Sequence, residues 1–97
     1  MLFALICTDK PGLLALRQAS RPAHLDYLRS HEAALQFAGP LLDPEGNPCG
    51  SLLVVEAADR AAAETFAAGD PYARAGLFES TVIRPMRQVA RDGKLGG

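Results

Sequence analysis

One stretch joins the last predicted helix to the last predicted strand: Ala67-Ala68-Gly69-Asp70-Pro71-Tyr72-Ala73-Arg74-Ala75-Gly76-Leu77. Gly69 is suited to the left-handed conformation that ends many helices. Asp70 precedes a proline, which favours an extended backbone, and its carboxylate can then cap a new helical turn that begins at Pro71. We therefore predict a short helix over residues 71–75, closed by Gly76. A helix cap alone accounts for Asp70.

A second stretch, Arg17-x-x-x-Arg21-x-x-His24, offers that carboxylate another partner. The three side chains are spaced as neighbours on one helix face. A histidine exchanges a proton near neutral pH, and a carboxylate on its other ring nitrogen orients it, so His24 and Asp70 are our candidate catalytic pair. Arg17 or Arg21 would hold an anionic group of the substrate, and Tyr72 would add a hydroxyl group at the rim of the cleft. The alternative is a packed histidine beside solvated arginines.

The rest of the chain alternates short apolar runs with helical ones. We predict strands over residues 2–8, 34–42, 51–57 and 77–86, and helices over 13–34 and 59–68. Pro22 falls inside the first helix, where it either kinks the helix or separates it from a second segment capped by Ser20. Gly39-Pro40 predicts an edge strand or a bulge. Residues 43–50 predict an exposed hairpin loop, and residues 88–97 a frayed tail.

This order of elements predicts one α+β domain over residues 1–97 with the ferredoxin-like βαββαβ fold. In that fold a four-stranded antiparallel sheet carries both helices on one face. Two of its strands, residues 2–7 and 52–55, are nevertheless apolar on both faces. Leaving such side chains in water costs about 1.5–3 kcal/mol each, so we expect a homodimer whose sheets pack face to face.

Composition and charge argue against several classes of protein. The chain has 97 residues and a formal net charge of -1 without a basic patch, which argues against a nucleic-acid partner. It has no apolar run of about 20 residues and no basic leader, so we expect no membrane association and a cytoplasmic location. Cys7 and Cys49 lack the spacing of a metal site, and no phosphate-binding glycine motif is present. We therefore expect no metal and no cofactor.

Several segments, in this order, resemble the YciI-like (YCII-related) family: Asp9-Lys10-Pro11-Gly12, Arg17-x-x-x-Arg21-Pro22-Ala23-His24-Leu25, Gly39-Pro40-Leu41-Leu42, Gly69-Asp70-Pro71-Tyr72 with Ala75-Gly76-Leu77-Phe78, and Val82-Ile83-Arg84-Pro85. The resemblance covers nearly the whole chain. It implies a dimeric α/β-barrel with a cleft that contains a His–Asp pair, which by motif is His24 and Asp70. A few family members resemble enzymes that eliminate chloride from chlorinated hydroxylated aromatics.

Together these patterns predict a cofactor-independent enzyme that applies acid–base chemistry to a small anionic or phenolic metabolite. The reaction would be an elimination, an isomerisation or a hydrolysis. The alternative hypothesis is a non-catalytic small-ligand-binding or dimerisation module that uses the same cleft. An enzyme needs His24 and Asp70 within hydrogen-bond reach or one water apart, whereas a binder needs only a concave pocket.

Overall fold

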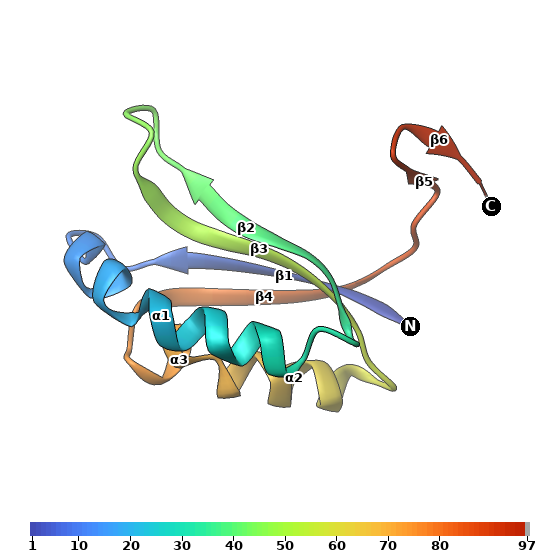
Figure 1. Cartoon of the computed structure of the whole chain (residues 1–97), viewed down its shortest axis with the longest axis horizontal. Coiled ribbons are helices and arrows are strands. Elements are labelled where there is room, and N and C mark those ends of the chain that lie inside the picture. Colours follow the sequence, from blue (N-terminus) through green and yellow to red (C-terminus); the bar gives the residue numbers. More distant parts are fainter. Residues whose placement is uncertain (97) are drawn as a thin grey trace.

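The structure, a computed structural model, describes residues 1–96 and consists of one main sheet with its helices on one side (Figure 1). The elements in chain order are β1 (Leu2–Asp9), α1 (Leu14–Ser30), β2 (Leu35–Leu42), β3 (Pro48–Glu56), α2 (Arg60–Gly69), α3 (Pro71–Arg74), β4 (Phe78–Met86), β5 (Ala90–Arg91) and β6 (Lys94–Leu95). The main sheet has the strand order β2-β3-β1-β4, and all its pairs are antiparallel. The predicted ferredoxin-like α+β fold, that of the dimeric α/β-barrel class, is confirmed.

The core lies between the sheet and the helices. Side chains alternate across a strand, so Phe3, Leu5 and Cys7 all point to the helical side of β1, where each is at most 3% exposed. Their neighbours on β3, Leu53 and Val55, are equally buried. This apolar layer fixes the register of the sheet, because a slip by one residue would turn every core side chain to the other face.

The helices leave one margin of this face uncovered. β2 is an edge strand, and its helix-side residues Ala38 and Pro40 remain exposed although they pair with buried Leu53 and Ser51 of β3. A groove therefore remains between α1 and the β2–β3 pair. The main pocket lies in this groove.

The prolines inside predicted elements, Pro22 and Pro40, lie within continuous secondary structure. Pro22 does not separate the first helix into two segments, because α1 runs from Leu14 to Ser30 as one element. Gly39-Pro40 lies on the predicted edge strand in regular register, and the irregularities fall at Leu35/Phe37 and Leu41/Leu42. β3 begins at Pro48, within the predicted loop, because Leu41 and Leu42 of β2 extend the ladder to Gly50 and Pro48.

Gly69 does not take the left-handed conformation predicted for it. It is the last residue of α2, and the chain leaves the helix through Asp70 in an extended conformation with φ −61° and ψ 127°. A Cβ atom at position 69 would lie 2.6 Å from the hydroxyl oxygen of Tyr27. Glycine is therefore needed here for close packing of α1 against α2.

The predicted frayed tail is also different in the structure. Residues 90–95 form a two-stranded hairpin, β5 with β6, which leaves the sheet on the side away from the helices (Figure 1). The hairpin satisfies backbone groups that the sequence pattern leaves unassigned, including a hydrogen bond from the Gly96 amide to the Val89 carbonyl. Within residues 1–96, no helix has both the length and the apolar character needed to cross a membrane.

Candidate active site

A pocket of about 180 Å³ opens between α1 and the exposed margin of the sheet. Its floor is formed by polar side chains of α1, β3 and α3, and its walls are mainly apolar. The lining residues are Arg17, Gln18, Arg21, His24, Leu25, Leu28, Ala38, Gly39, Pro40, Pro48, Ser51, Leu53 and Tyr72. The pocket therefore combines an apolar slot with a small group of convergent polar atoms, the usual make-up of a small-molecule site.

His24 and Asp70 meet at this pocket. The Nδ1 atom of His24 lies 2.8 Å from Oδ1 of Asp70, and both side chains are buried. An ionised carboxylate can only accept hydrogen bonds, so Nδ1 carries a hydrogen, and in the neutral imidazole the lone pair lies on Nε2. Nε2 is thus the nitrogen that remains available to a molecule in the pocket.

Asp70 also caps α3, so the cap and the histidine partner are one residue. The same Oδ1 atom accepts a hydrogen bond of 2.9 Å from the backbone N–H of Tyr72. Pro71 fixes the first helical position, and the extended backbone of Asp70 turns its carboxylate back toward α1. The two interpretations of Asp70 left open by the sequence are both satisfied.

Tyr72 is buried beneath the pocket. The sequence predicted it at the rim of the cleft. Its ring stacks on the His24 ring with centroids 4.0 Å apart and planes 17° apart. The Arg17 guanidinium carbon lies 4.5 Å from the centroid of the same ring. Burial raises the pKa of the Tyr72 hydroxyl above its ordinary value, although nearby Arg17 and Arg21 oppose the shift. Tyr72 therefore stays protonated at neutral pH.

Arg17 forms hydrogen bonds with two residues of its own chain, Asp9 and Ser51. Its Nε donates to Oδ2 of Asp9 at 2.7 Å, and its Nη2 donates to Oδ1 of Asp9 at 2.9 Å. The same Nη2 donates to the Ser51 hydroxyl at 2.8 Å. Burial opposes the charge of Arg17, but the hydrogen bond and charge of Asp9 outweigh it and raise the pKa of the guanidinium. Arg17 is thus a fixed, neutralised cation under the pocket.

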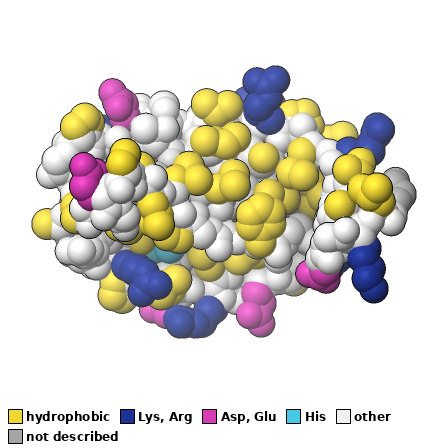
Figure 2. Space-filling view, turned by 90° about the horizontal axis from the view of Figure 1, so that it is seen from above, with side chains coloured by type: hydrophobic (Ala, Val, Ile, Leu, Met, Phe, Trp, Pro, Cys, Tyr) yellow, Lys and Arg dark blue, Asp and Glu magenta, His cyan; other side chains and the backbone are white. Residues whose placement is uncertain are grey.

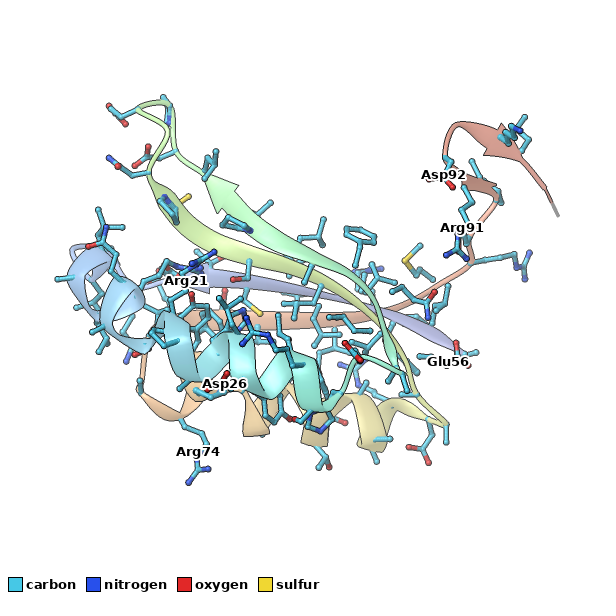
Figure 3. All side chains as sticks on the ribbon, viewed as in Figure 1. Arg21, Asp26, Glu56, Arg74, Arg91 and Asp92 are labelled. Carbon is cyan, nitrogen blue, oxygen red and sulfur yellow. The ribbon has the colours of Figure 1, made fainter. Side chains whose placement is uncertain are left out.

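Arg21 lies one turn along α1 and is exposed. In Figure 3 its side chain extends from α1 on the side of the strands, whereas Arg74 of α3 points away from them. It lines the pocket and makes no hydrogen bond or salt bridge with another residue in the range 1–96. Within residues 1–96 all the donors of Arg21 are therefore free, whereas Asp9 and Ser51 occupy Nε and Nη2 of Arg17.

Two further polar residues lie at the site. Asp9 ends the first predicted strand, where the sequence allows either a turn residue or a residue that faces the cleft, and Ser51 was assigned only to the start of a strand. Asp9 sits in a motif shared with the family resemblance, and Ser51 is a lone polar residue on an otherwise apolar strand face, so each carried a weak signal. Within the described residues, no group of three His, Cys, Asp or Glu side chains is arranged to hold a metal ion.

Comparisons with known proteins agree with this architecture. Residues 1–87 match the profile of the YCII-related domain. Protein YciI from Escherichia coli O6:H1 is 33% identical over 97 residues, which span 92% of this chain and 99% of that protein. An uncharacterized Haemophilus influenzae protein is also 33% identical, over 98 residues, with the same coverage.

Solved structures show similar folds. The 5-chloro-2-hydroxyhydroquinone dehydrochlorinase of Burkholderia phenoliruptrix AC1100, solved with 2,5-dihydroxybenzoquinone, superposes with a TM-score of 0.86 at 34% identity, over 90% of this chain and 94% of that one. An antibiotic biosynthesis monooxygenase superposes with a TM-score of 0.56 at 18% identity, over 93% of this chain and 100% of that one. At that identity, the second likeness concerns the fold alone.

Proposed function

The chain belongs to the YCII-related domain family, and we propose that its pocket is the active site of a cofactor-independent enzyme. In this proposal His24 takes or gives a proton through Nε2, and Asp70 holds the imidazole in the required tautomer and orientation. The observation that carries the proposal is the buried 2.8 Å contact between His24 and Asp70 beside a pocket. A histidine with a purely packing role would not need a buried carboxylate on one nitrogen and open space on the other.

The proposed substrate is a small hydroxylated aromatic or another anionic or phenolic metabolite. The pocket volume of about 180 Å³ suits a single ring, since an apolar cavity of roughly 150 Å³ holds benzene. Leu25, Leu28 and Leu53 supply the apolar walls for its faces. Arg21 would attract an oxyanion from the mouth of the pocket. The substrate of the structurally similar dehydrochlorinase, a chlorinated hydroquinone, has this chemistry.

An elimination illustrates how the pair would work. Nε2 of His24 would take the proton of a ring hydroxyl, and the electron pair of the O–H bond would form a C=O bond. The displaced ring π electrons would take up a proton at the carbon that carries the chlorine. Loss of the proton of a second ring hydroxyl would then form a second C=O bond, and the π electrons shifted by it would form a C=C bond as chloride leaves with the electrons of the C–Cl bond. The same base could serve an isomerisation or a hydrolysis, because each begins with transfer of one proton.

Turnover of 5-chloro-2-hydroxyhydroquinone, alongside a panel of phenols and lactones, tests this proposal. We expect chloride release or substrate consumption with the wild-type chain, and its loss in His24→Gln. The matched control is His31→Gln, because His31 packs against Tyr27 and Phe66 away from the pocket. Equal rates in the wild type and His24→Gln would contradict the proposal. Ligand binding without any turnover would favour the binding-module alternative.

We also propose that the chain forms a homodimer through the sheet face that the helices leave open. Figure 2 looks onto that face and shows hydrophobic side chains gathered at its centre. By register the apolar residues on this face of the sheet are Leu2, Ala4, Ile6, Phe37, Leu41, Leu52, Val82 and Met86. Val54 lies among them but is only 3% exposed. Phe37 is 53% exposed and Val82 46% exposed, although both lie beside other apolar residues. A contiguous apolar surface of this kind usually marks an association site.

Sedimentation of a charge variant tests the dimer. Val82→Glu should shift the chain from dimer to monomer, because a carboxylate would be buried without a partner in the interface. Ala68→Glu, on the exposed surface of α2, is the matched control and should remain dimeric. A wild-type chain that sediments as a monomer at micromolar concentration would contradict the proposal.

A further inference from the structure

Ser51 is a polar residue at the pocket that the proposed proton transfer does not use. It lies on β3 on the same face as Leu53 and Val55, it is only 3% exposed, and it lines the pocket. A hydroxyl group on an apolar strand face costs free energy unless its hydrogen-bonding capacity is used. The contacts within the chain use only part of that capacity.

The direction of the Ser51 hydroxyl is set by Arg17. Within residues 1–96 the hydroxyl makes one hydrogen bond, in which its oxygen accepts from Nη2 of Arg17 at 2.8 Å. A guanidinium has no acceptor, so the hydroxyl hydrogen cannot point at Arg17. Asp9 holds Nε and Nη2 at the same time, which prevents the guanidinium from turning away. The hydrogen is therefore left to point toward the adjoining pocket.

We propose that Ser51 contacts the bound molecule directly, donating its hydroxyl hydrogen to a ring oxygen, and that Arg17 and Asp9 act as its positioning residues. This inference rests on the proposed function, because it concerns the ligand of the same pocket. The preferred ligands are hydroxyquinones and hydroxylated aromatics that carry two oxygens. One oxygen accepts from Ser51, and a hydroxyl group elsewhere on the ring meets His24.

The arrangement gives the pocket a strong donor with little net charge. Donation from the Arg17 cation polarises the Ser51 O–H bond and strengthens it as a donor. The Asp9 carboxylate meanwhile neutralises Arg17, with side-chain exposures of 5% for Arg17 and 7% for Asp9. A site that buries such a donor discriminates against analogues that lack the oxygen, because the donor is then left unpaired. Ser51 would thus set specificity for ring oxygens.

Titration with 2,5-dihydroxybenzoquinone, the ligand of the similar dehydrochlorinase, tests this inference. Ser51→Ala should weaken binding by about tenfold to a hundredfold, the loss of one hydrogen bond to a charged or strongly polar oxygen. Ser51→Cys keeps the size of the side chain with a much weaker donor and should also weaken binding, so the test does not depend on how well one variant folds. Ser80→Ala is the matched control, since Ser80 is exposed on β4 outside the pocket.

A double-mutant cycle tests the positioning role. Arg17→Lys keeps a positive charge but lacks the fork that bonds Asp9 and Ser51 together. It should weaken ligand binding in the wild-type background and have no further effect in the Ser51→Ala background. Equal weakening in both backgrounds would show that Arg17 does not act through Ser51.

The outcomes separate this inference from the proposed function. If the wild type and Ser51→Ala bind 2,5-dihydroxybenzoquinone equally well, the role of Ser51 is overturned while the His24–Asp70 proposal stands. If the wild type does not bind it, the hydroxyquinone ligand class is overturned and the inference about Ser51 falls with it. If the Ser51 variants lose affinity while Ser80→Ala does not, with the melting temperature retained, the inference is supported.

Discussion

Two buried side-chain pairs lie along one face of α1, about two helical turns apart, and they differ in which atoms remain available to the pocket. Arg17 with Asp9 is a forked pair of two buried side chains, and Nη2 of Arg17 also donates to Ser51. His24 with Asp70 has a single hydrogen bond between side chains and leaves one ring nitrogen for the pocket. The Tyr72 ring contacts both His24 and Arg17. The first pair is built to hold a geometry, and the second is suited to exchange a proton.

The largest expected effect is the loss of activity when His24 is replaced, because only the His24–Asp70 pair is proposed to exchange a proton. His24→Gln should lower kcat/KM by about 10²- to 10⁴-fold, because the amide cannot take up a proton. Its NH₂ group can still donate to Asp70, so the free energy of unfolding should change by no more than about 1 kcal/mol. Steady-state kinetics and urea unfolding on the same preparation measure both quantities. If His24→Gln loses stability as well as activity, the His24–Asp70 pair would have a structural role like that of the Arg17–Asp9 pair.

The next effect is on stability. Asp9→Asn should lower the free energy of unfolding by about 3–5 kcal/mol, because it leaves the buried Arg17 charge without its counter-ion. Asp26→Asn is the matched control, since Asp26 forms an exposed pair with Arg29 and exposed pairs contribute less than about 1 kcal/mol. Chemical unfolding compares the two variants. Similar losses from both would mean that the Arg17 pair does not stabilise the site.

Asp70→Asn should have a smaller effect on both quantities. We expect kcat/KM to fall by about tenfold to a hundredfold, because the orienting partner of His24 is weakened while its shape is kept. The weakened cap of α3 should cost about 0.5–2 kcal/mol of stability. Asp59→Asn, which alters only the cap of α2, is the control for the cap. An activity equal to that of Asp59→Asn would show that Asp70 acts only as a cap.

The smallest expected effect is a loss of stability at high pH. It comes from ionisation of Cys7, whose thiol is influenced by the charges of Asp70, Arg17 and Asp9. Burial raises the pKa of its thiol to about 11, the Thr81 hydrogen bond lowers it, and the Asp70 charge adds to the rise. The thiol ionises near its ordinary value of 9.0 in the unfolded chain. The unfolded state therefore loses its proton first, and stability falls as the pH rises from 9 toward 11, by about 1–2 kcal/mol.

Urea unfolding of two cysteine variants across this pH range isolates that effect. Cys7→Ala should flatten the decline in the free energy of unfolding, whereas Cys49→Ala, at an exposed cysteine, should not. Adding Asp70→Asn to the wild-type chain should lower the pKa of Cys7, because it removes a charge that raises it. If the two cysteine variants lose stability in parallel, Cys7 is not the titrating group.

Much of the fold was predictable because its signals are local. Caps and turns act within a few residues, so Asp59 and Asp70-Pro71 marked the starts of α2 and α3 correctly. Short apolar runs bounded by turn residues located the four main strands, and the spacing of Arg17, Arg21 and His24 placed them on one helix. Pairing His24 with Asp70 needed the family resemblance as well, since 46 residues separate them.

The remaining features depended on residues far apart in the chain. A continuous α1 through Pro22 and a glycine at position 69 follow from packing between elements, which local propensities do not describe. The bond from Arg17 to Ser51 spans 34 residues, and only the register of β3 against the helical layer brings Ser51 beneath α1. The sequence alone determined that Arg17, Arg21 and His24 share one helix and that Asp70 begins a short one. The tertiary structure decided which arginine is neutralised, because hydrogen-bond partners are selected by distance in the packed core.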